Sequence, residues 1–313
     1  MNVLLTGATG FLGQRLAVKI EALSDFNLTS VVRSEVGSLA GKKVFISQID
    51  GDTDWRSALI DQDLIVHTAA RAHIMKEEVS DYLKEYRRVN VDGTLNLARQ
   101  AVDAGVTRFI FISSIKVNGE QTTCSGVYKA EDLTAPEDAY GISKYEAEQG
   151  LLQIAADTGL EVVIIRPPLV YGPGVKGNFS SMMQVVKKGF PLPLGAINNM
   201  RSLVALDNLV DLIITCINHP AAANQVFLAG DGEDLSTTEL LRGVAKAAGV
   251  PSRLLPVPAS VLMFMASLLG KKTMAQRLLG SLQVDISKAR DLLGWTPPLS
   301  VEEGLRRCFV RNA

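Results

Sequence analysis

Apolar residues in the first half of the chain gather in short, unbroken runs, and longer segments with helical spacing separate these runs. Unbroken apolar runs predict strands buried on both faces, and apolar residues three and four apart predict helices. The alternation of the two is typical of a parallel sheet covered by helices on both sides. We expect strands at residues 3–6, 28–33, 43–46, 63–67, 108–113, 161–166 and 225–229. We expect helices at residues 11–23, 80–104, 139–158, 207–218 and 236–248. The pattern therefore predicts an α/β fold with a doubly wound parallel sheet of the Rossmann type.

Proline and glycine become frequent after Arg166, and they mark loops there. We therefore expect two domains. The first is a dinucleotide-binding Rossmann domain made of residues 1–166 plus about 201–230. The second is a smaller, loop-rich C-terminal substrate lobe made of residues 167–200 plus about 231–313. This lobe is expected to cover the carboxyl ends of the strands, where ligands of such sheets bind.

Composition and charge narrow the class of protein. The chain has 313 residues, with 32 basic and 33 acidic side chains and a net charge of −1. This balance argues against nucleic-acid binding, which depends on a basic excess. The three cysteines and three histidines are scattered, so we expect neither a disulfide framework nor a metal site.

The first residues lack the basic segment of a secretory signal, so we expect a cytoplasmic protein. The longest apolar run, residues 259–269, is too short to cross a bilayer, so no membrane insertion is expected. The run is best explained as a core or interface helix, and a helix lying on a membrane surface is the alternative.

Three glycines, Gly7, Gly10 and Gly13, follow the first expected strand and open the first expected helix. Gly7 would allow a tight turn, Gly10 would admit a pyrophosphate close to the backbone, and Gly13 would let helix and strand pack closely. The free N–H groups of a helix N-terminus favour phosphate binding. This context predicts a dinucleotide site, and an ordinary strand-to-helix turn is the alternative.

The adenosine end of that site is expected near Arg33. NAD-binding sheets usually carry a carboxylate about twenty residues beyond the glycines, where it binds the ribose hydroxyls. Here the segment reads VVRS, with no acidic residue and with Arg33 available for a 2′-phosphate. NADP(H) is therefore favoured and NAD(H) stays possible. A solvated arginine with no ligand is the alternative.

Tyr140 and Lys144 lie four residues apart at the start of an expected helix, so both side chains share one face. We expect the lysine charge, together with the positive ring of an oxidised nicotinamide, to lower the pKa of the phenol. The tyrosine could then move a proton at an alcohol or ketone oxygen. Ser114, just after the strand at 108–113, could bind the same oxygen. Taken alone, a tyrosine and a lysine at this spacing more often lie on a solvent-exposed helix face. Because the glycine loop and the serine at a strand end occur in the same chain, catalysis is the stronger interpretation here.

Together these features resemble the extended short-chain dehydrogenase/reductases, a group of nucleotide-sugar epimerases, dehydratases and 4-keto reductases. The resemblance covers essentially the whole chain. It rests on the segments 6–13 (TGATGFLG), 67–70 (HTAA), 90–94 (NVDGT), 112–119 (ISSIKVNG), 140–144 (YGISK), 166–173 (RPPLVYGP) and 201–207 (RSLVALD).

The resemblance implies roles for individual residues. Tyr140 would be the catalytic acid and base, Lys144 its electrostatic partner and a ribose ligand, and Ser114 the third catalytic residue. With the glycines and Arg33 included, the expected cofactor-binding residues are Gly7, Gly10, Phe11, Leu12, Gly13, Arg33, Gln48, Ile49, Ala69, Ala70, Asn90, Tyr140, Lys144, Pro167 and Val170. The expected substrate-binding residues, for the sugar, uridine and diphosphate of a UDP-sugar, are Ser114, Asn178 and Arg201. The resemblance also implies a homodimer formed through the helices at 80–104 and 139–158.

Within the group, residues 113–120 and 281–288 look most like a subgroup of bacterial surface-polysaccharide synthesis. That subgroup is similar to UDP-N-acetylquinovosamine dehydrogenase, a UDP-4-keto-6-deoxy-sugar reductase. Asn118 stands where many 4-epimerases have tyrosine, and Gln48 and Ile49 stand where an aspartate often reads the adenine amine. The sequence therefore favours an NAD(P)-dependent oxidoreductase at C4 of a UDP-sugar, a reductase of UDP-4-keto-6-deoxy-N-acetylhexosamines that consumes NADPH. A UDP-hexose or UDP-hexosamine 4-epimerase that recycles its NAD is the alternative, and a non-catalytic NAD(P)-sensing regulator is a minor one.

Overall fold

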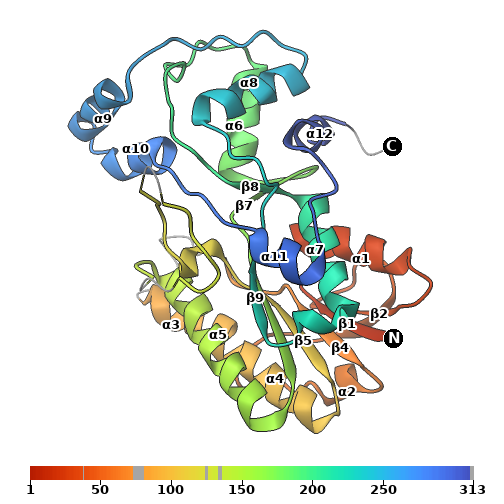
Figure 1. The fold of residues 1–313 in the computed structure, drawn as a ribbon. Helices are drawn as coiled ribbons and strands as arrows, with labels where there is room; N and C mark the ends of the chain where they lie inside the picture. The colour runs from red at the N-terminus through yellow and green to blue at the C-terminus, as the bar shows by residue number, and fades with distance from the viewer. Residues whose placement is uncertain (38, 73–80, 124–125, 133–135, 311–313) are drawn as a thin grey trace.

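The computed structural model describes residues 1–37, 39–72, 81–123, 126–132 and 136–310. Figure 1 shows a parallel sheet with helices on both faces and a smaller lobe built mainly from the second half of the chain. The chain enters the smaller lobe from the carboxyl end of β6 (Glu161–Arg166).

All seven strands of the main sheet run parallel, in the order β3-β2-β1-β4-β5-β6-β9. In that order they span Lys42–Phe45, Asn27–Val32, Asn2–Thr6, Leu64–His67, Arg108–Ile112, Glu161–Arg166 and Gln225–Leu228. The chain winds outward from β1 to β3 and then returns to β4 to build the other half. The predicted doubly wound sheet is therefore confirmed, and the strand order reverses between β1 and β4, where such sheets bind ligands.

Each face of the sheet has its own apolar layer. One layer contains side chains of α1 (Phe11–Glu21), α7 (Leu206–Asn218) and α11 (Ser287–Leu293). The other contains side chains of α2 (Arg56–Leu59), α4 (Gly93–Asp103) and α5 (Ala139–Thr158). The strands are buried on both sides, which explains why they appear in the sequence as unbroken apolar runs.

The smaller lobe has a third apolar core, formed by α6 (Gly177–Lys187), α8 (Thr237–Ala247) and α12 (Val301–Arg307). Two short strands, β7 (Leu169–Tyr171) and β8 (Leu203–Ala205), pair in parallel beside it. The prediction of a loop-rich segment after Arg166 missed β7 and α6. Strands of three residues are too short to show a pattern, and glycine and proline border α6 on both sides.

The long helix expected at 80–104 is interrupted. Its described part consists of α3 (Tyr82–Tyr86), a wide π-helical turn η1 (Arg87–Asp92) and α4. A Cβ at Gly93 would lie 2.7 Å from Ile49 Cγ2, so the start of α4 packs directly against the segment after β3. Wide turns of this kind are frequent near functional sites because they redirect side chains.

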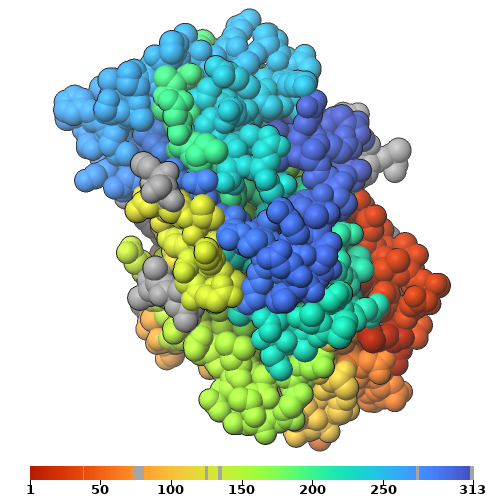
Figure 2. Space-filling view, viewed as in Figure 1, coloured from red at the N-terminus to blue at the C-terminus, as the bar shows by residue number. Residues whose placement is uncertain are grey.

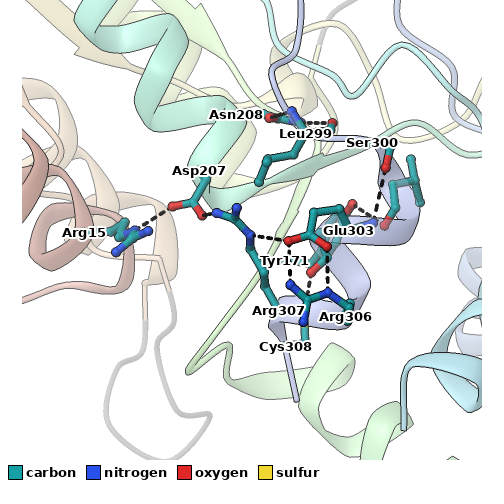
Figure 3. A network of polar contacts seen from close by, with 12 residues as sticks. Arg15, Tyr171, Asp207, Asn208, Leu299, Ser300, Glu303, Arg306, Arg307 and Cys308 are labelled. Carbon is teal, nitrogen blue, oxygen red and sulfur yellow. Dashed lines mark hydrogen bonds and ion pairs between the residues drawn. The ribbon is translucent and has the colours of Figure 1, made fainter. Parts of the chain in front are cut away.

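An ion-pair cluster joins the sheet to the smaller lobe (Figure 3). Asp207, at the start of α7, accepts hydrogen bonds of 2.5 Å from Arg15 Nε on α1 and from Arg307 Nη1 on α12. Arg307 also donates to Glu303, one turn earlier on α12. Beside this cluster, the side-chain amide of Asn208 exchanges two hydrogen bonds with the backbone of Leu299. The beginning of α1, which carries the glycine loop, is therefore fixed to the C-terminal helix.

The apolar run at 259–269 forms α9 (Ala259–Leu268), which is followed by α10 (Lys272–Leu279). No residue of α9 is buried, so the helix is not part of a core. The other half of that expectation, an interface helix, stays a prediction. In the part of the chain that the structure describes, no helix has the length and apolar character needed to cross a membrane.

Candidate active site

The glycine loop lies between the end of β1 and the start of α1, as the sequence predicts. Gly7 has a φ of 71°, a conformation that favours glycine. A Cβ at Gly13 would lie 2.1 Å from the carbonyl oxygen of Gly7, so helix and turn are in contact there. No side chain caps the N-terminus of α1 at Gly10, which leaves the first turn, with Phe11 and Leu12, accessible to an anion. The loop therefore fits a phosphate-bearing ligand.

A cavity of about 500 Å³ opens beside this loop. Seven of the predicted cofactor residues line it: Gly7, Gly10, Arg33, Gln48, Ile49, Ala69 and Ala70. Three arginines, Arg33, Arg71 and Arg88, also belong to its wall, and no acidic residue is among the described residues that line it. Arginines in such a wall favour a ligand with phosphate groups. Arg71 and Arg88 also form ion pairs with carboxylates that do not line the cavity.

The sequence did not lead us to Arg88, Ser47 or Thr9 in this wall. Arg88 arrives through the wide turn η1, which the sequence pattern hides within a helical segment. Its guanidinium also contacts Glu85 at 3.3 Å and Asp50 at 3.6 Å, so it is held at the edge of the cavity. Arg71 and His73 follow the segment HTAA directly, and from the sequence both are candidates for contact with a phosphate or a sugar. His73 lies outside the described residues.

Asn90 is buried behind the cavity wall. Its side-chain oxygen accepts from the N–H of Arg71 at 2.8 Å, and its amide donates to the carbonyl of Arg71 and to Ser143 Oγ. Both amide hydrogens are thereby used within the protein. Asn90 therefore holds the segment at 69–71 against α5, and direct contact of Asn90 with a cofactor stays a prediction.

Lys144 and Ser114 both lie at the carboxyl end of β5, and α5, which carries Tyr140, begins beside it. Lys144 Nζ donates a 2.8 Å hydrogen bond to the carbonyl of Ile112, two residues before Ser114. A Cβ at Gly141 would lie 3.2 Å from the carbonyl of Lys116, so the start of α5 contacts η2 (Ile115–Val117), whose N-terminus Ser114 caps. Asp138 caps α5 in turn, accepting from the N–H groups of Tyr140 and Gly141. Lys144 and the start of α5 thus lie at the strand end that carries Ser114. The Tyr140 ring packs edge-on against Tyr86, with ring centres 5.8 Å apart. A meeting of the Tyr140 hydroxyl with Lys144 and Ser114 stays a prediction.

Burial dominates the electrostatics of Tyr140 and Lys144. Burial raises the pKa of the Tyr140 phenol above its ordinary value, and Asp138 and Tyr86 raise it further. Burial also lowers the pKa of Lys144 to about 7, against the opposing effect of Glu148. In the protein without a ligand, burial disfavours both charged forms. The expected lowering, which included the charge of an oxidised nicotinamide, stays a prediction. A buried phenol keeps its proton until a further positive charge lies beside it.

Pro167 adjoins the same group, because the N–H of Ile115 donates to the Pro167 carbonyl at 3.0 Å. Val170 lies on β7, paired with Val204. Both therefore border the passage from the sheet to the smaller lobe, as expected for residues that follow β6.

Asn178 and Arg201, the two residues predicted to bind the UDP group, lie in different surroundings. Asn178 lies in the first turn of α6 and is exposed. Arg201 is less accessible, and its Nη1 donates to the carbonyls of Arg277 and Gly280 at the end of α10. A guanidinium at that position is favoured by the helix dipole. Arg201 thus supports α10, and its contact with a diphosphate stays a prediction.

Among the described residues, no group of three His, Cys, Asp or Glu side chains is arranged to hold a metal ion.

Comparison with known protein families shows the family to which this chain belongs. Residues 3–230 match the NAD dependent epimerase/dehydratase family. The chain belongs to that family, and the predictions of an enzyme and of the extended short-chain dehydrogenase/reductase class are confirmed.

Two relatives indicate where in the family it lies. The chain is 51% identical to a protein of Vibrio cholerae named UDP-glucose 4-epimerase, over 98% of this chain and 94% of that one. It is 29% identical to the N-acetyl-α-D-glucosaminyl-diphospho-ditrans,octacis-undecaprenol 4-epimerase of Escherichia coli O157:H7, over 98% and 93% of the two chains. Both names describe 4-epimerases, so the relatives favour our alternative over the predicted reductase.

Solved structures agree on the fold. The UDP-glucose 4-epimerase of Thermotoga maritima, solved with UDP-glucose, has a TM-score of 0.76 at 23% identity and is covered to 97%, with 98% of this chain matched. The UDP-glucuronic acid 4-epimerase of Bacillus cereus, solved with NAD, has a TM-score of 0.77 at 21% identity, with 98% and 94% of the chains matched.

Proposed function

We propose that this protein is a 4-epimerase of UDP-linked hexoses or N-acetylhexosamines that uses a bound nicotinamide dinucleotide. The observation that carries the proposal is the 51% identity, over 98% of the chain, to a relative named UDP-glucose 4-epimerase. Two observations support the same function. The cavity at the glycine loop is lined by arginines, which would hold phosphate groups, and Lys144 lies at the end of β5, where Tyr140 would transfer the proton.

The residues of the cleft would bind the dinucleotide as follows. The first turn of α1 would receive the pyrophosphate, and Gly10 would keep the backbone open to it. Lys144 would donate to the ribose, and residues 31–33 and 46–49 would enclose the adenosine. Hydride exchange at C4 of the sugar is the chemistry that a bound nicotinamide supplies.

Tyr140 would move the proton in this reaction. Its phenolate would take the proton from the C4 hydroxyl when the hydride leaves C4 for the nicotinamide. The resulting phenol would return the proton to the same oxygen after the keto sugar has rotated in the site. Ser114 would hold that oxygen by a hydrogen bond throughout. Since burial keeps the phenol protonated, the positive charge of Lys144 and of the oxidised ring is needed to make it a base.

The smaller lobe would hold the UDP group, with Asn178 near the uridine and Arg201 near the diphosphate. A homodimer through α5 and the helices of residues 82–103 is part of the same proposal. The preference for NADP over NAD that Arg33 suggests is a finer proposal, since the family description refers to NAD.

The experiment is an epimerisation assay without added cofactor. Purified protein is incubated with UDP-glucose or UDP-N-acetylglucosamine, and the 4-epimers are separated by chromatography. An epimerase with a retained dinucleotide reaches the same ratio of the two epimers whether the reaction starts from a UDP-sugar or from its 4-epimer. No epimer from any of these sugars, with oxidation of NADPH by a UDP-4-keto sugar instead, would overturn the proposal in favour of the reductase.

A further inference from the structure

The helix α9 presents its apolar side chains to solvent rather than to the protein. Val261, Phe264, Met265 and Leu268 recur at intervals of three and four residues, which places them on one face of the helix. All four are exposed, and the exposed fraction is 63% for Phe264 and 68% for Leu268. Leu269 extends the stripe at the C-terminal end. A contiguous apolar face of this kind on a monomer marks a contact surface.

The position of this face suits a contact made outside the active site. Figure 1 shows α9 at the outer edge of the smaller lobe, packed beside α10 and remote from the seven-stranded sheet. In the space-filling view, the same segment projects from the molecule at the upper left (Figure 2). A flat surface could therefore reach the stripe without covering the cleft beside the glycine loop.

The chain segment that contains the stripe is basic. Between Leu240 and Val284 the chain has no acidic residue and six basic ones: Arg242, Lys246, Arg253, Lys271, Lys272 and Arg277. This segment therefore carries +6 in a chain of net charge −1, which leaves −7 for the rest. Lys246 and Arg277 have acidic partners in Glu302 and Glu120. In the described part of the chain, the exposed Lys271 and Lys272 form no ion pair, and they directly follow the stripe.

We propose that α9 and the lysines after it dock this protein on a bilayer surface that contains anionic phospholipids. An apolar stripe next to unpaired lysines is the arrangement of helices that lie in the headgroup region, with the apolar face inserted and the lysines near lipid phosphates. A second copy of the chain fits this surface less well, because self-association would bring two strongly basic segments together. This docking is independent of which sugar the enzyme uses.

Flotation of the intact protein with lipid vesicles tests the proposal. We expect binding to phosphatidylcholine vesicles that contain phosphatidylglycerol, weaker binding to phosphatidylcholine alone, and a decrease with added salt. The variant Phe264→Ser/Leu268→Ser should lose about tenfold or more in vesicle affinity, because two large apolar side chains no longer insert. The variant Lys271→Gln/Lys272→Gln should lose about tenfold for anionic vesicles only.

The matched control is Ile60→Ser. Ile60 is 62% exposed, as exposed as Phe264, but it lies at the end of α2 on the sheet domain. This variant should bind vesicles like the wild type. Thermal unfolding of every variant verifies that the fold is retained.

A fluorescence measurement provides independent evidence. Both tryptophans of the chain, Trp55 and Trp295, are buried, so a tryptophan introduced by Phe264→Trp reports on α9. Its emission should shift to shorter wavelength when anionic vesicles are added. The proposal is overturned by absence of flotation with anionic vesicles, by flotation that the Phe264→Ser/Leu268→Ser variant leaves unchanged, or by a dimer in solution that this variant abolishes.

Discussion

Lys144 and the carbonyl of Ile112 are joined by a 2.8 Å hydrogen bond that fixes α5 to the end of β5. The same ammonium lies 4.3 Å from the centre of the Phe111 ring. Both contacts orient a buried cation toward the strand end that Ser114 follows, and they explain why a lysine is tolerated in the core. The position of the catalytic helix thus depends on the residue that we expect to assist catalysis.

Burial lowers the pKa of Lys144 to about 7, whereas a lysine in an unfolded chain titrates near 10.4. Between these pH values the unfolded chain binds a proton that the folded protein does not, so stability from this residue rises with pH. The free energy of unfolding of the wild type, relative to that of Lys144→Met, should therefore increase by on the order of a few kcal/mol from pH 7 to 10. Chemical denaturation at several pH values checks this, and a constant difference would contradict the lowered pKa.

Tyr140→Phe removes the phenolic hydroxyl and keeps the ring that contacts Tyr86. We expect kcat for epimerisation to fall by roughly 100- to 10,000-fold, the range for loss of a general acid or base. Dinucleotide affinity, measured by fluorescence titration, should change little. Unchanged turnover of the sugars that the wild type epimerises would remove Tyr140 from the mechanism.

A substitution of Arg33 tests whether the protein prefers NADP(H) to NAD(H). Replacing it by alanine should weaken NADPH binding by about 10- to 100-fold if its guanidinium pairs with the 2′-phosphate. NADH binding should stay within a factor of a few. Lys19→Ala, on the exposed side of α1, is the matched control for loss of a positive charge. Equal losses for both dinucleotides would show that Arg33 does not read the 2′-phosphate.

Gly13→Ala would place a methyl group 2.1 Å from the Gly7 carbonyl oxygen. Because that oxygen belongs to a turn packed against Thr68 and Ala69, it cannot move freely. We expect a loss of roughly 1–3 kcal/mol in the free energy of unfolding, together with weaker nucleotide binding. Gly37→Ala is the control, since a Cβ there meets no atom within 4 Å. Normal stability of Gly13→Ala would show that the turn can adjust.

Asp207 should stabilise the joint between the sheet and the smaller lobe. Burial raises the pKa of its carboxyl, but hydrogen bonds from Arg15 and Arg307 outweigh this and leave the pKa below its ordinary value. A lowered pKa contributes stability above the unfolded value of about 3.9, and this stability is lost as the pH falls through the folded value. Asp207→Asn should thus cost about 1 kcal/mol at neutral pH, after allowance for solvent around the partly exposed arginines, and less in acid.

Thermal unfolding of Asp207→Asn at pH 7 and at about pH 2, where carboxyl groups are largely protonated, measures this effect. A matched control is Lys246→Gln, which removes an exposed ion pair with Glu302 and should change the melting temperature little. The same deficit for Asp207→Asn at both pH values would contradict the ionic origin of the effect.

The sheet and the glycine loop could be predicted because local sequence dictates them. The strands are buried on both faces and therefore apolar throughout, and Gly7 and Gly13 are required by a positive φ and by a close contact. The pair Tyr140 and Lys144 could be found because helical spacing alone puts them on one face. These features depend on few long-range contacts.

Other features depend on tertiary structure and leave no local signal. The turn η1 is stabilised by Asn90, which bonds to Ser143 on another helix, and by the approach of Gly93 to Ile49. The raised pKa of Tyr140 follows from burial, which the sequence does not report. The solvent exposure of α9 could not be predicted for a similar reason, since an apolar helix has the same sequence whether it faces a core or a surface.

The π-helical turn η1 limits which insertions and deletions this protein can tolerate. In a regular helix one residue corresponds to a rotation of about 100°. Deleting a single residue between Arg87 and Asp92 would therefore swing α3 around the axis of α4 and carry Arg88 out of the cavity wall, even with every remaining side chain intact. The mouth of the cleft is set by the number of residues in this turn as well as by their chemistry, so insertions and deletions here should be far more harmful than substitutions.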